Sequence, residues 1–539
     1  MIRNLNLADD AGAVCDAQVC IIGGGTAGIF LAQQLRKLGL QVVMLETGDT
    51  VARNPEEIGQ FCEQRGIQYR GAESGRSFGL GGTSALWGGQ MIPLAKSDLE
   101  DRLEVGFEAW PIDFAEVASY LPVVRQQLGL SAETDFAEEV NADLQQRKFP
   151  ALRELSDDFN LRLSEWLPFK KRNFAMSFAD RLTDDDGLTV WLNATVIDMA
   201  RSSSATIPQI QTITAQSPNG RRLLVRPSVV VISAGALEST RLLLEFDESS
   251  EGSITRSGAP LGRYFADHLS VTCGRFVCSD WRRYNLAAAP IFENGLMRTP
   301  RLEVTSLAQK KLGMTSAFAH FTFETNGVTG FDVVRNFLRR RQGEQQRLGF
   351  SPALLGRVVK DVSAMTFWRG VYQRLWIPRE ADLLLQVDIE QTPNADSRLY
   401  LSSERDGLNR KRLVIDWQIK PEDVRVIRKM ANLSIDAWQS STLGDVADLH
   451  LVLPDKFDSF ATLYDVYHPT GSLRMGNSST NSVVDKNLRL WAMNNCFVTT
   501  TAVFPSAGSA NPGMTHLALT ARLAEHCGKY LKTPENLIP

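Results

Sequence analysis

The chain lacks the features that would stabilise it covalently or around a metal ion. Its seven cysteines are an odd number, and no C-x-x-C pair occurs among them. An odd count without paired spacing argues against a disulfide framework and against a zinc site. We therefore expect reduced thiols, most of them buried, and no metal.

The chain also lacks a dominant charge and a long hydrophobic run. Its formal net charge is −4 over 539 residues, so no basic excess predicts nucleic-acid binding. No run approaches the roughly 18 apolar residues that a membrane-spanning helix needs. The segment Met1 to Asp16 is polar and acidic, unlike a secretory signal. These absences lead us to expect a cytoplasmic location.

What the chain does have is a dinucleotide-binding turn near its N-terminus. The run Ala17 to Gly23 (A-Q-V-C-I-I-G) predicts a buried parallel strand, and Ile29 to Leu38 predicts a helix. Gly23, Gly25 and Gly28 form the G-x-G-x-x-G pattern between them. Such glycines permit a tight turn and close approach to a pyrophosphate, which the N–H groups and dipole of the helix N-terminus attract.

The residues after the turn complete the nucleotide-binding pattern. Gln41 to Leu45 predict a second strand, and Glu46 follows it, 18 residues after Gly28. This spacing is typical of an acid that hydrogen-bonds a ribose hydroxyl. The turn alone leaves FAD and NAD open, whereas an acid at Glu46 argues against the 2′-phosphate of NADP.

A second glycine-rich segment runs from Gly79 to Gly89 (G-L-G-G-T-S-A-L-W-G-G). Five glycines in eleven residues exclude the interior of a regular helix or strand. Leu80, Leu86 and Trp87 make the segment too apolar for a flexible surface loop. We predict that it lies against the cofactor.

Later segments predict that the cofactor domain is discontinuous. Arg226 to Ile232 has a buried-strand pattern, and a small-residue turn and a helix from Leu237 to Leu244 follow it. Leu188 to Asp198 predicts one alternating strand. Phe265 to Phe276, Thr315 to Phe323 and Leu383 to Ile389 predict strands that could form a sheet over the cofactor.

The segment Phe331 to Trp376 predicts basic, amphipathic helices. It could be a lid, a partner-docking flap or a membrane-surface flap. It could also be a helix pair with a solvated basic face, which Glu344 and Asp361 favour because they dilute the charge. Its basic residues include Arg335, Arg339, Arg340, Arg341, Arg347, Arg357, Lys360, Arg369 and Arg374.

At this point the chain resembles the glucose–methanol–choline (GMC) oxidoreductases, FAD enzymes that act on alcohols. The resemblance covers essentially the whole chain, and its motifs follow the order of the family. They are the Gly23 turn with Glu46, the loop from Arg76 to Gly89, Trp110-Pro111, Val196, A-G-A-L-E-S-T from Ala234, G-R-Y-F-A-D-H from Gly262, E-Q-T-P-N from Glu390, H-P-T-G-S-L-R-M-G from His468, and F-P-S-A-G-S-A-N-P-G-M-T from Phe504.

The resemblance implies which residues hold FAD. Val196 matches the family residue whose backbone contacts the adenine. The predicted cofactor-binding set is Gly23, Gly25, Thr26, Ala27, Gly28, Glu46, Arg76, Gly82, Thr83, Ser84, Val196, Ala234, Gly235, Thr501, Ala502, Pro512 and Thr515. His468 matches the catalytic histidine, and Asn511 matches a second catalytic position that is His or Asn in the family.

Two departures from the family refine these expectations. Some members bond FAD covalently through a histidine in the glycine-rich loop, where this chain has Leu86, so the resemblance implies non-covalent FAD. Many members carry proline where this chain has Thr240. This departure and E-Q-T-P-N favour the pyranose-oxidase and sugar-dehydrogenase branch, and hence a sugar or polyol substrate.

The pairing of His468 with Asn511 suits alcohol oxidation. The hydroxyl must lose its proton while a hydride leaves the same carbon for flavin N5. A histidine with a pKa near 6.5 is largely neutral at pH 7 and can accept that proton. Asn511 can orient the substrate oxygen. His268 is the rival base, for which a structural hydrogen-bonding role is expected, and His516 is expected to point away.

These arguments predict an α/β fold (α+β overall) in which a discontinuous Rossmann-like FAD-binding domain carries an inserted substrate domain of antiparallel sheet and helices. The FAD-binding domain is expected in residues 1–115, 185–268 and 462–539, and the substrate domain in 116–184 and 269–461.

The predicted function is FAD-dependent oxidation of a CH–OH group of a sugar, glycoside or polyol. A catalytic subunit that passes electrons to a partner and a non-redox FAD-containing lyase stay as alternatives. The electron acceptor (oxygen, a quinone or a partner protein) is left open, and a peripheral membrane or protein partner is not favoured.

Overall fold

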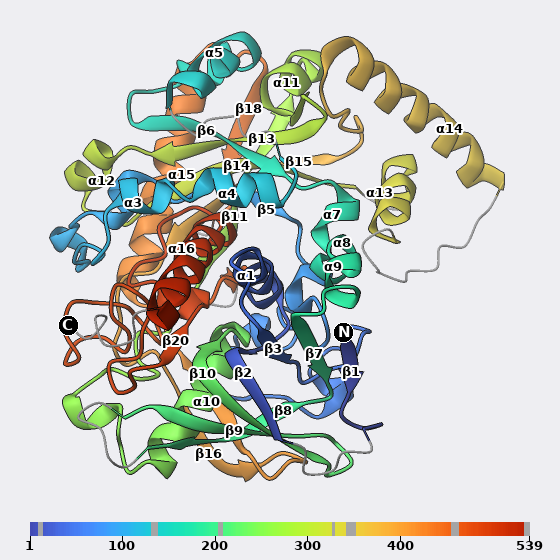
Figure 1. Cartoon of the computed structure of the whole chain (residues 1–539). Helices are drawn as coiled ribbons and strands as arrows, with labels where there is room; N and C mark the ends of the chain where they lie inside the picture. Colours follow the sequence, from blue (N-terminus) through green and yellow to red (C-terminus); the bar gives the residue numbers. More distant parts are fainter. Residues whose placement is uncertain are drawn as a thin grey trace.

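The architecture is that of a computed structural model, which describes residues 1–8, 14–130, 138–202, 208–325, 329–340, 352–453 and 463–532. Two large sheets divide the molecule, one in the lower and one in the upper half of Figure 1. The predicted α/β fold class is confirmed. Among the residues described, no helix combines the length and the apolar character needed to cross a membrane.

The lower sheet holds the N-terminal strand of the nucleotide-binding pattern at its centre. Its strand order is β1-β7-β3-β2-β10-β9-β8, and β20 also pairs with β10. Neighbouring strands in the series β1-β7-β3-β2-β10 are parallel, and so are β10 and β20. Strand β9 pairs antiparallel with β10 and with β8. The bounds are β1 Ile2–Asn4, β2 Val14–Ile22, β3 Val42–Leu45, β7 Leu188–Leu192, β8 Thr195–Arg201, β9 Ile210–Gln216, β10 Arg222–Ile232 and β20 Cys496–Val498.

One predicted strand of this sheet is two strands. Leu188 to Asp198 was expected to be continuous, but β7 ends at Leu192 and β8 begins at Thr195. Asn193 between them has a φ of 53°, a left-handed conformation that a continuous strand does not contain. The alternation of the sequence continues across the turn, so the pattern alone did not reveal it.

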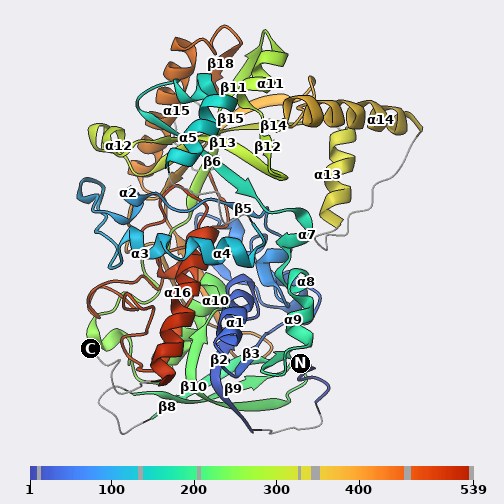
Figure 2. The ribbon, with the colours of Figure 1, turned by 45° about the horizontal axis from the view of Figure 1, so that its top comes forward.

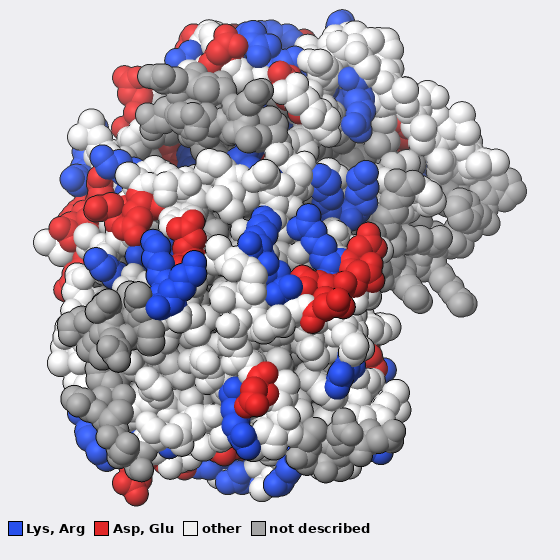
Figure 3. Space-filling model, viewed as in Figure 1, with Lys and Arg blue, Asp and Glu red and all other residues white. Residues whose placement is uncertain are grey.

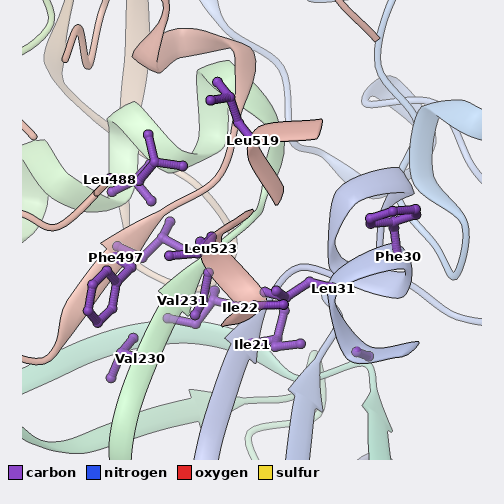
Figure 4. Packing of buried hydrophobic residues seen from close by; sticks show 14 of the residues in the cluster. Ile21, Ile22, Phe30, Leu31, Val230, Val231, Leu488, Phe497, Leu519 and Leu523 are labelled. Atoms are coloured by element: carbon purple, nitrogen blue, oxygen red, sulfur yellow. The ribbon is translucent and has the colours of Figure 1, made fainter. Parts of the chain in front are cut away.

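Helices α1 (Thr26–Lys37), α10 (Gly235–Ser249) and α16 (Gly513–Lys532) pack around this sheet. Strands β2 and β10 are buried on both faces over their last four residues, and β3 is buried throughout, as expected for a sheet covered on two sides. Figure 4 shows Ile21 and Ile22 of β2, Val230 and Val231 of β10, Leu31 of α1 and Leu523 of α16 in this core. Burial of these faces holds the turn between β2 and α1 in place.

The upper sheet is antiparallel and has the order β18-β11-β15-β14-β13-β6-β5. Two short strands extend it, since β12 pairs with β13 and β19 pairs with β11. The long helix α15 (Pro421–Ser440) packs against β14, β15 and β18. The bounds are β5 Gln90–Met91, β6 Phe159–Trp166, β11 His268–Cys278, β12 Ile291–Glu293, β13 Leu296–Val304, β14 Ala317–Glu324, β15 Asp382–Glu390, β18 Ala447–Leu451 and β19 Tyr464–Asp465.

Several elements cross the predicted domain limits. Strand β4 (Glu63–Gly66) pairs in parallel with β17 (Lys411–Trp417), which also pairs with β16 (Arg398–Arg405). Strand β5 joins the upper sheet although it was placed in the segment 1–115. Helices α3 (Phe114–Ala118) and α4 (Leu121–Gln127) pack against α16. The chain therefore passes between the two sheets more often than the predicted limits allow.

Helices α13 (Gly330–Arg340) and α14 (Pro352–Phe367) lie in the predicted basic segment. They project from the side of the upper sheet in both ribbon views (Figures 1 and 2). Of its basic residues, Arg341 and Arg347 lie outside the described residues. On the face of the molecule in Figure 3, Lys and Arg side chains are intermixed with Asp and Glu.

The remaining helices are short or lie at the periphery. They are α2 Lys96–Leu99, α5 Glu138–Lys148, α6 Pro150–Arg153, α7 Phe169–Arg172, α8 Phe174–Ser177, α9 Ala179–Thr183, α11 Trp281–Ala288 and α12 Ser306–Leu312.

Candidate active site

A cavity of about 630 Å³ runs between the two sheets. One end is lined by the turn after β2, the end of β3, the start of β8 and the turn before α10. The other end is lined by strands of the upper sheet and by two C-terminal segments that contain His468 and Asn511. The cavity thus joins the predicted nucleotide-binding turn to the predicted catalytic pair.

The turn after β2 has the shape that a pyrophosphate needs. Gly23 has a φ of 108°, and a Cβ atom at this position would lie 2.6 Å from the carbonyl oxygen of Ser233. Helix α1 begins directly after Gly25, whose position provides no side-chain cap for the first N–H groups. Free N–H groups at a helix N-terminus attract an anion. The residues present therefore fit a dinucleotide diphosphate.

The glycine-rich loop lies against this turn. The N–H of Gly81 donates to the carbonyl oxygen of Gly24 at 2.8 Å, and a Cβ atom on Gly82 would lie 3.0 Å from the Cα of Gly25. Gly82, Thr83, Leu86 and Trp87 all line the cavity. Two glycine segments that are far apart in sequence thus form one narrow wall.

Glu46 connects both glycine segments. Its Oε2 accepts the N–H of Gly24 at 2.7 Å, and its Oε1 accepts the N–H groups of Gly48 and Gly79 at 2.9 and 3.1 Å. Burial raises the pKa of this carboxyl, while the N–H groups act in the opposite direction. Glu46 also lines the cavity. Its predicted ribose contact stays a prediction, and the structure adds a role in fixing the turn.

Most of the predicted cofactor residues line the cavity, and four lie behind its wall. Those that line it are Gly23, Gly25, Thr26, Ala27, Glu46, Arg76, Gly82, Thr83, Val196, Ala234, Gly235, Thr501 and Pro512. The lining does not include Gly28, Ser84, Ala502 or Thr515.

Contacts of these four residues show that they support the wall. A Cβ atom on Gly28 would lie 2.0 Å from the carbonyl oxygen of Gly23, so the helix packs directly on the turn. The hydroxyl of Ser84 donates to the carbonyl oxygen of Gly81 at 2.6 Å, and that of Thr515 accepts the N–H of Leu94 at 3.0 Å. Ala502 is fully buried. The cofactor contact that the resemblance implies for each of these residues stays a prediction, and the structure adds a role in supporting the wall.

The catalytic pair lies at the other end of the cavity. Asn511 precedes α16, and His468 follows β19, so different parts of the fold bring them to one wall. The N–H of His468 donates to Oδ2 of Asp267 at 2.7 Å. The hydroxyl of Thr501 donates to the carbonyl oxygen of Pro469 at 2.6 Å. Both contacts fix the backbone on either side of the imidazole.

The His468 ring is half-buried and neutral. Burial lowers its pKa to about 3, and the positive charges that His268 and Arg301 can carry act in the same direction, while Asp388 opposes them. A neutral imidazole is the form that accepts a proton. The site therefore keeps the base ready at any pH well above that value.

Two histidines that were not placed in the site belong to its wall. His268 lines the cavity, and its Nδ1 lies 3.0 Å from Nδ1 of His468. His516 also lines the cavity, contrary to the expectation that it points away. Because α16 begins at Gly513, His516 lies in its first turn, and its Nε2 lies 3.3 Å from Oγ1 of Thr499.

The upper sheet contributes further side chains that sequence reasoning missed. Gln386 and Asp388 alternate along β15, and Phe318 and His320 alternate along β14. The register places Phe318 opposite Asp388 and His320 opposite Gln386. All four line the cavity. Polar residues at every second position of an apolar strand were the signal, since alternate residues share one face.

Asp388 gives this face an ionised carboxylate. Burial would raise its pKa, but the nearby His320 side chain, hydrogen bonds from His320 and Ser270, and Arg301 together lower it. Nε2 of His320 lies 3.1 Å from Oδ2 of Asp388. The wall also holds Gln90 and the ring of Trp166. The catalytic end therefore combines aromatic faces with hydrogen-bonding groups.

Sequence comparisons with known proteins find two family models and a relative that match this chain. The family model described as GMC oxidoreductase matches residues 393–520, and the model described as FAD binding domain matches residues 16–69. A curated relative, the 6'''-hydroxyparomomycin C oxidase of Streptomyces lividus, is 20% identical over 557 residues. These cover 94% of this chain and 91% of the relative.

Solved structures give the same picture for the fold. Pyridoxine 4-oxidase from Mesorbium loti has a TM-score of 0.58 at 16% identity, over 95% of this chain and 99% of that chain. A variant of formate oxidase from Aspergillus oryzae RIB40 has a TM-score of 0.56 at 14% identity, over 97% of this chain and 99% of that chain. At identities this low, the structural likeness shows a shared fold alone.

Proposed function

We propose that this chain, which matches the GMC oxidoreductase and FAD-binding family models, oxidises a CH–OH group of a sugar, glycoside or polyol to a carbonyl, with His468 as the base. Bound FAD supplies the acceptor for the hydride. One observation carries the proposal: His468 and Asn511 line the same cavity as the Gly23 turn. The predicted family and cofactor are confirmed by the two family models.

The proposed role of His468 is to take the hydroxyl proton of the substrate. Its neutral ring has a nitrogen lone pair available, and its backbone is fixed by Asp267. A pKa near 3 makes the resting imidazole a weak base. Negative charge that develops on the substrate oxygen raises that pKa during the reaction, because an opposite charge nearby favours the protonated form.

The proposed role of Asn511 is to hold the substrate oxygen. Its Oδ1 accepts a hydrogen bond from Arg301 at 3.2 Å, so the amide N–H groups stay available to the cavity. A donor aimed at an oxygen that gains negative charge lowers the barrier. The amide of Asn511 is also not basic, so it does not compete with His468 for the substrate proton.

The substrate class is supported by the wall of the catalytic end. Trp166 and Phe318 offer flat apolar surfaces, while Gln90, Gln386 and Asp388 offer hydrogen-bonding groups. A site with buried partners for several hydroxyl groups discriminates against compounds that lack them, because those partners then stay unpaired. The curated relative, going by its name, oxidises a hydroxylated paromomycin, which fits a substrate rich in hydroxyl groups.

We further propose that FAD is held without a covalent bond from the glycine-rich loop. Leu86 lines the cavity at the place where the resemblance expects a histidine in some members. An aliphatic side chain has no nucleophilic atom for such a bond. FAD should therefore be released on denaturation and appear free in the supernatant.

An anaerobic substrate screen tests the proposed function. Purified FAD-loaded protein is mixed with sugars, glycosides, polyols and simple alcohols, and loss of the flavin absorbance is recorded. We expect bleaching by at least one hydroxyl-rich compound and faster bleaching than by simple alcohols. Bleaching by simple alcohols alone would overturn the substrate class, and no bleaching by any alcohol would favour a non-redox lyase.

The same preparation identifies the electron acceptor. After reduction by the active substrate, oxygen, a quinone or an artificial dye is added, and flavin reoxidation and peroxide are measured. Rapid reoxidation by oxygen with peroxide indicates an oxidase. Reoxidation by a quinone or dye alone indicates a dehydrogenase that serves another carrier.

A further inference from the structure

His268 and His468 meet because two extended segments run antiparallel beside each other. Ala266 and Thr470 exchange backbone hydrogen bonds of 3.2 and 2.8 Å. Two positions further along one segment and two positions back along the other, His268 lies opposite His468. Residues two apart in an extended strand share a face, so both rings lie on one side of the pair. The rings are nearly perpendicular, at 86°, with centroids 5.2 Å apart.

A chain of two hydrogen bonds runs through these rings. Nε2 of His268 lies 2.7 Å from the carbonyl oxygen of Gly508, and Nδ1 of His268 lies 3.0 Å from Nδ1 of His468. The His268 ring is buried, and the His468 ring is half-buried. Nε2 of His468 makes no hydrogen bond to any residue in the described part of the chain, and His468 lines the cavity.

The carbonyl of Gly508 determines which ring nitrogens carry a hydrogen in these two hydrogen bonds. A carbonyl oxygen only accepts, so Nε2 of His268 must carry a hydrogen and donate. In a neutral imidazole the other nitrogen then carries a lone pair. Nδ1 of His268 is therefore an acceptor, and Nδ1 of His468 must carry the hydrogen that it accepts. Nε2 of His468 is left with its lone pair directed to the cavity side of the ring.

The opposite arrangement places like groups against each other. With the proton of His268 on Nδ1, its Nε2 lone pair would face the carbonyl oxygen of Gly508 at 2.7 Å. Two buried acceptors would then be unpaired, which is unfavourable. A doubly protonated His268 is disfavoured as well, since burial lowers the pKa of His268. When both imidazoles are neutral, one placement of their hydrogens satisfies both hydrogen bonds.

We propose that His268 is a positioning residue that sets the tautomer of His468, so that Nε2 of His468 is the atom that takes the substrate proton. The inference rests on the proposed role of His468 as base. When Nε2 of His468 takes the proton, the ring becomes cationic, and its Nδ1–H bond to His268 becomes charge-assisted and stronger. His268 thus orients the base before the reaction and stabilises its charged form during it.

The test combines a direct view of the tautomer with a rate. The FAD-loaded enzyme is labelled with ¹⁵N in its histidines, and the His468 signals are assigned from their loss in His468→Gln. We expect a protonated Nδ1 and an unprotonated Nε2 in His468. A proton on Nε2 of the resting enzyme would overturn the proposal, whatever the rates are.

Substitutions of His268 supply the second readout. His268→Leu removes the acceptor, so we expect flavin reduction to slow on the order of 10–100-fold, the cost of losing an outer partner that orients a histidine, and protonation of Nε2 in part of the His468 population. His268→Asn keeps an acceptor oxygen near the Nδ1 position and should recover most of the rate. An equal loss in both variants, with the His468 tautomer unchanged, would overturn the proposal.

Two controls separate this inference from the proposed function. His450 is exposed on β18, so His450→Leu makes the same change outside the site and should leave the rate unaltered. His468→Gln reports on the base itself. A slow His468→Gln beside a fast His268→Leu refutes only the positioning role. A fast His468→Gln refutes the base assignment, while the ¹⁵N spectra still decide the tautomer.

Discussion

Arg301 donates a hydrogen bond from Nη1 to Oδ1 of Asn511 at 3.2 Å, and this contact decides which end of the amide faces the cavity. A guanidinium has no acceptor, so the amide oxygen must point toward it. Arg301 itself is buried, and its Cζ lies 3.2 Å from the centroid of the Phe318 ring. Burial lowers the pKa of Arg301 to about 10, which leaves it charged at neutral pH.

The role of the Asn511 amide N–H groups can therefore be tested separately from the contact of its oxygen with Arg301. Asn511→Asp keeps an oxygen for Arg301 but loses the amide N–H groups, and Asn511→Leu loses both. We expect flavin reduction to slow by about 10²–10³-fold in each, the range for a lost oxyanion donor. Stopped-flow absorbance under anaerobic conditions measures the rate. If Asn511→Asp retains the wild-type rate, the donor is not part of the reaction.

Removal of the proposed base should separate catalysis from cofactor binding. His468→Ala is expected to keep its FAD, because the diphosphate wall lies at the other end of the cavity. Flavin reduction should slow by about 10²–10⁴-fold, as for a lost general base. The ratio of flavin to protein absorbance reports loading, and His450→Ala is the matched control. An unchanged rate in His468→Ala would exclude it as the base.

Gly25→Val should prevent FAD binding while the fold persists. The backbone of Gly25 has φ −82° and ψ −163°, which a valine can adopt. Its Cβ would lie 4.0 Å from the Cα of Gly82, so the added methyl groups fill the gap between the two glycine segments. Colourless protein with an unaltered far-UV spectrum is the expected result.

Gly356→Val provides the control for this change. Gly356 is exposed on α14, and a Cβ atom there would meet nothing within 4 Å. This variant should purify with a full complement of FAD. Full loading of Gly25→Val would instead show that the diphosphate does not lie between Gly25 and Gly82.

Asp388→Asn should weaken the binding of hydroxyl-rich substrates more than that of simple alcohols. Hydrogen bonds to charged groups contribute about 1.5–3 kcal/mol, which is roughly 10–150-fold in the dissociation constant. Titration of flavin reduction against substrate concentration yields that constant. Asp396→Asn is the control, because the Asp396 side chain is 76% exposed. An equal effect on all alcohols would place Asp388 outside substrate recognition.

Acid should destabilise the protein through two histidines whose pKa is lowered in the folded state. Burial lowers the pKa of His468 to about 3 and that of His516 to about 4, from 6.5. Between these values the unfolded chain binds more protons than the native one, so the free energy of unfolding falls as the pH falls below about 6.5. Each histidine contributes at most about 1.4 kcal/mol per pH unit.

Denaturant unfolding between about pH 7 and pH 4.5 measures this dependence. His516→Asn should show a shallower loss of stability than the unsubstituted protein, because it lacks one of the protons involved. His450→Asn, at an exposed position, should leave the slope unchanged. A His516→Asn slope equal to that of the unsubstituted protein would mean that His516 is not held neutral by burial.

Local sequence patterns were sufficient to predict the nucleotide-binding part of the fold. The strand, the glycine turn, the helix and Glu46 follow one another directly, and their spacing is set by backbone geometry over a few residues. The turn between β7 and β8 was missed because Asn193 interrupts a strand pattern without interrupting its alternation.

The amino-acid sequence by itself was sufficient for the resemblance to GMC oxidoreductases, the expectation of FAD and the residues of the turn, because these depend on short segments with fixed spacing. Only the tertiary structure decided that Glu46 joins two glycine segments, that Arg301 orients Asn511, and that His268 lies 3.0 Å from His468. These contacts join residues that are far apart in the chain. Strand register and the packing of one sheet over the other create them, and neither is encoded in a local pattern.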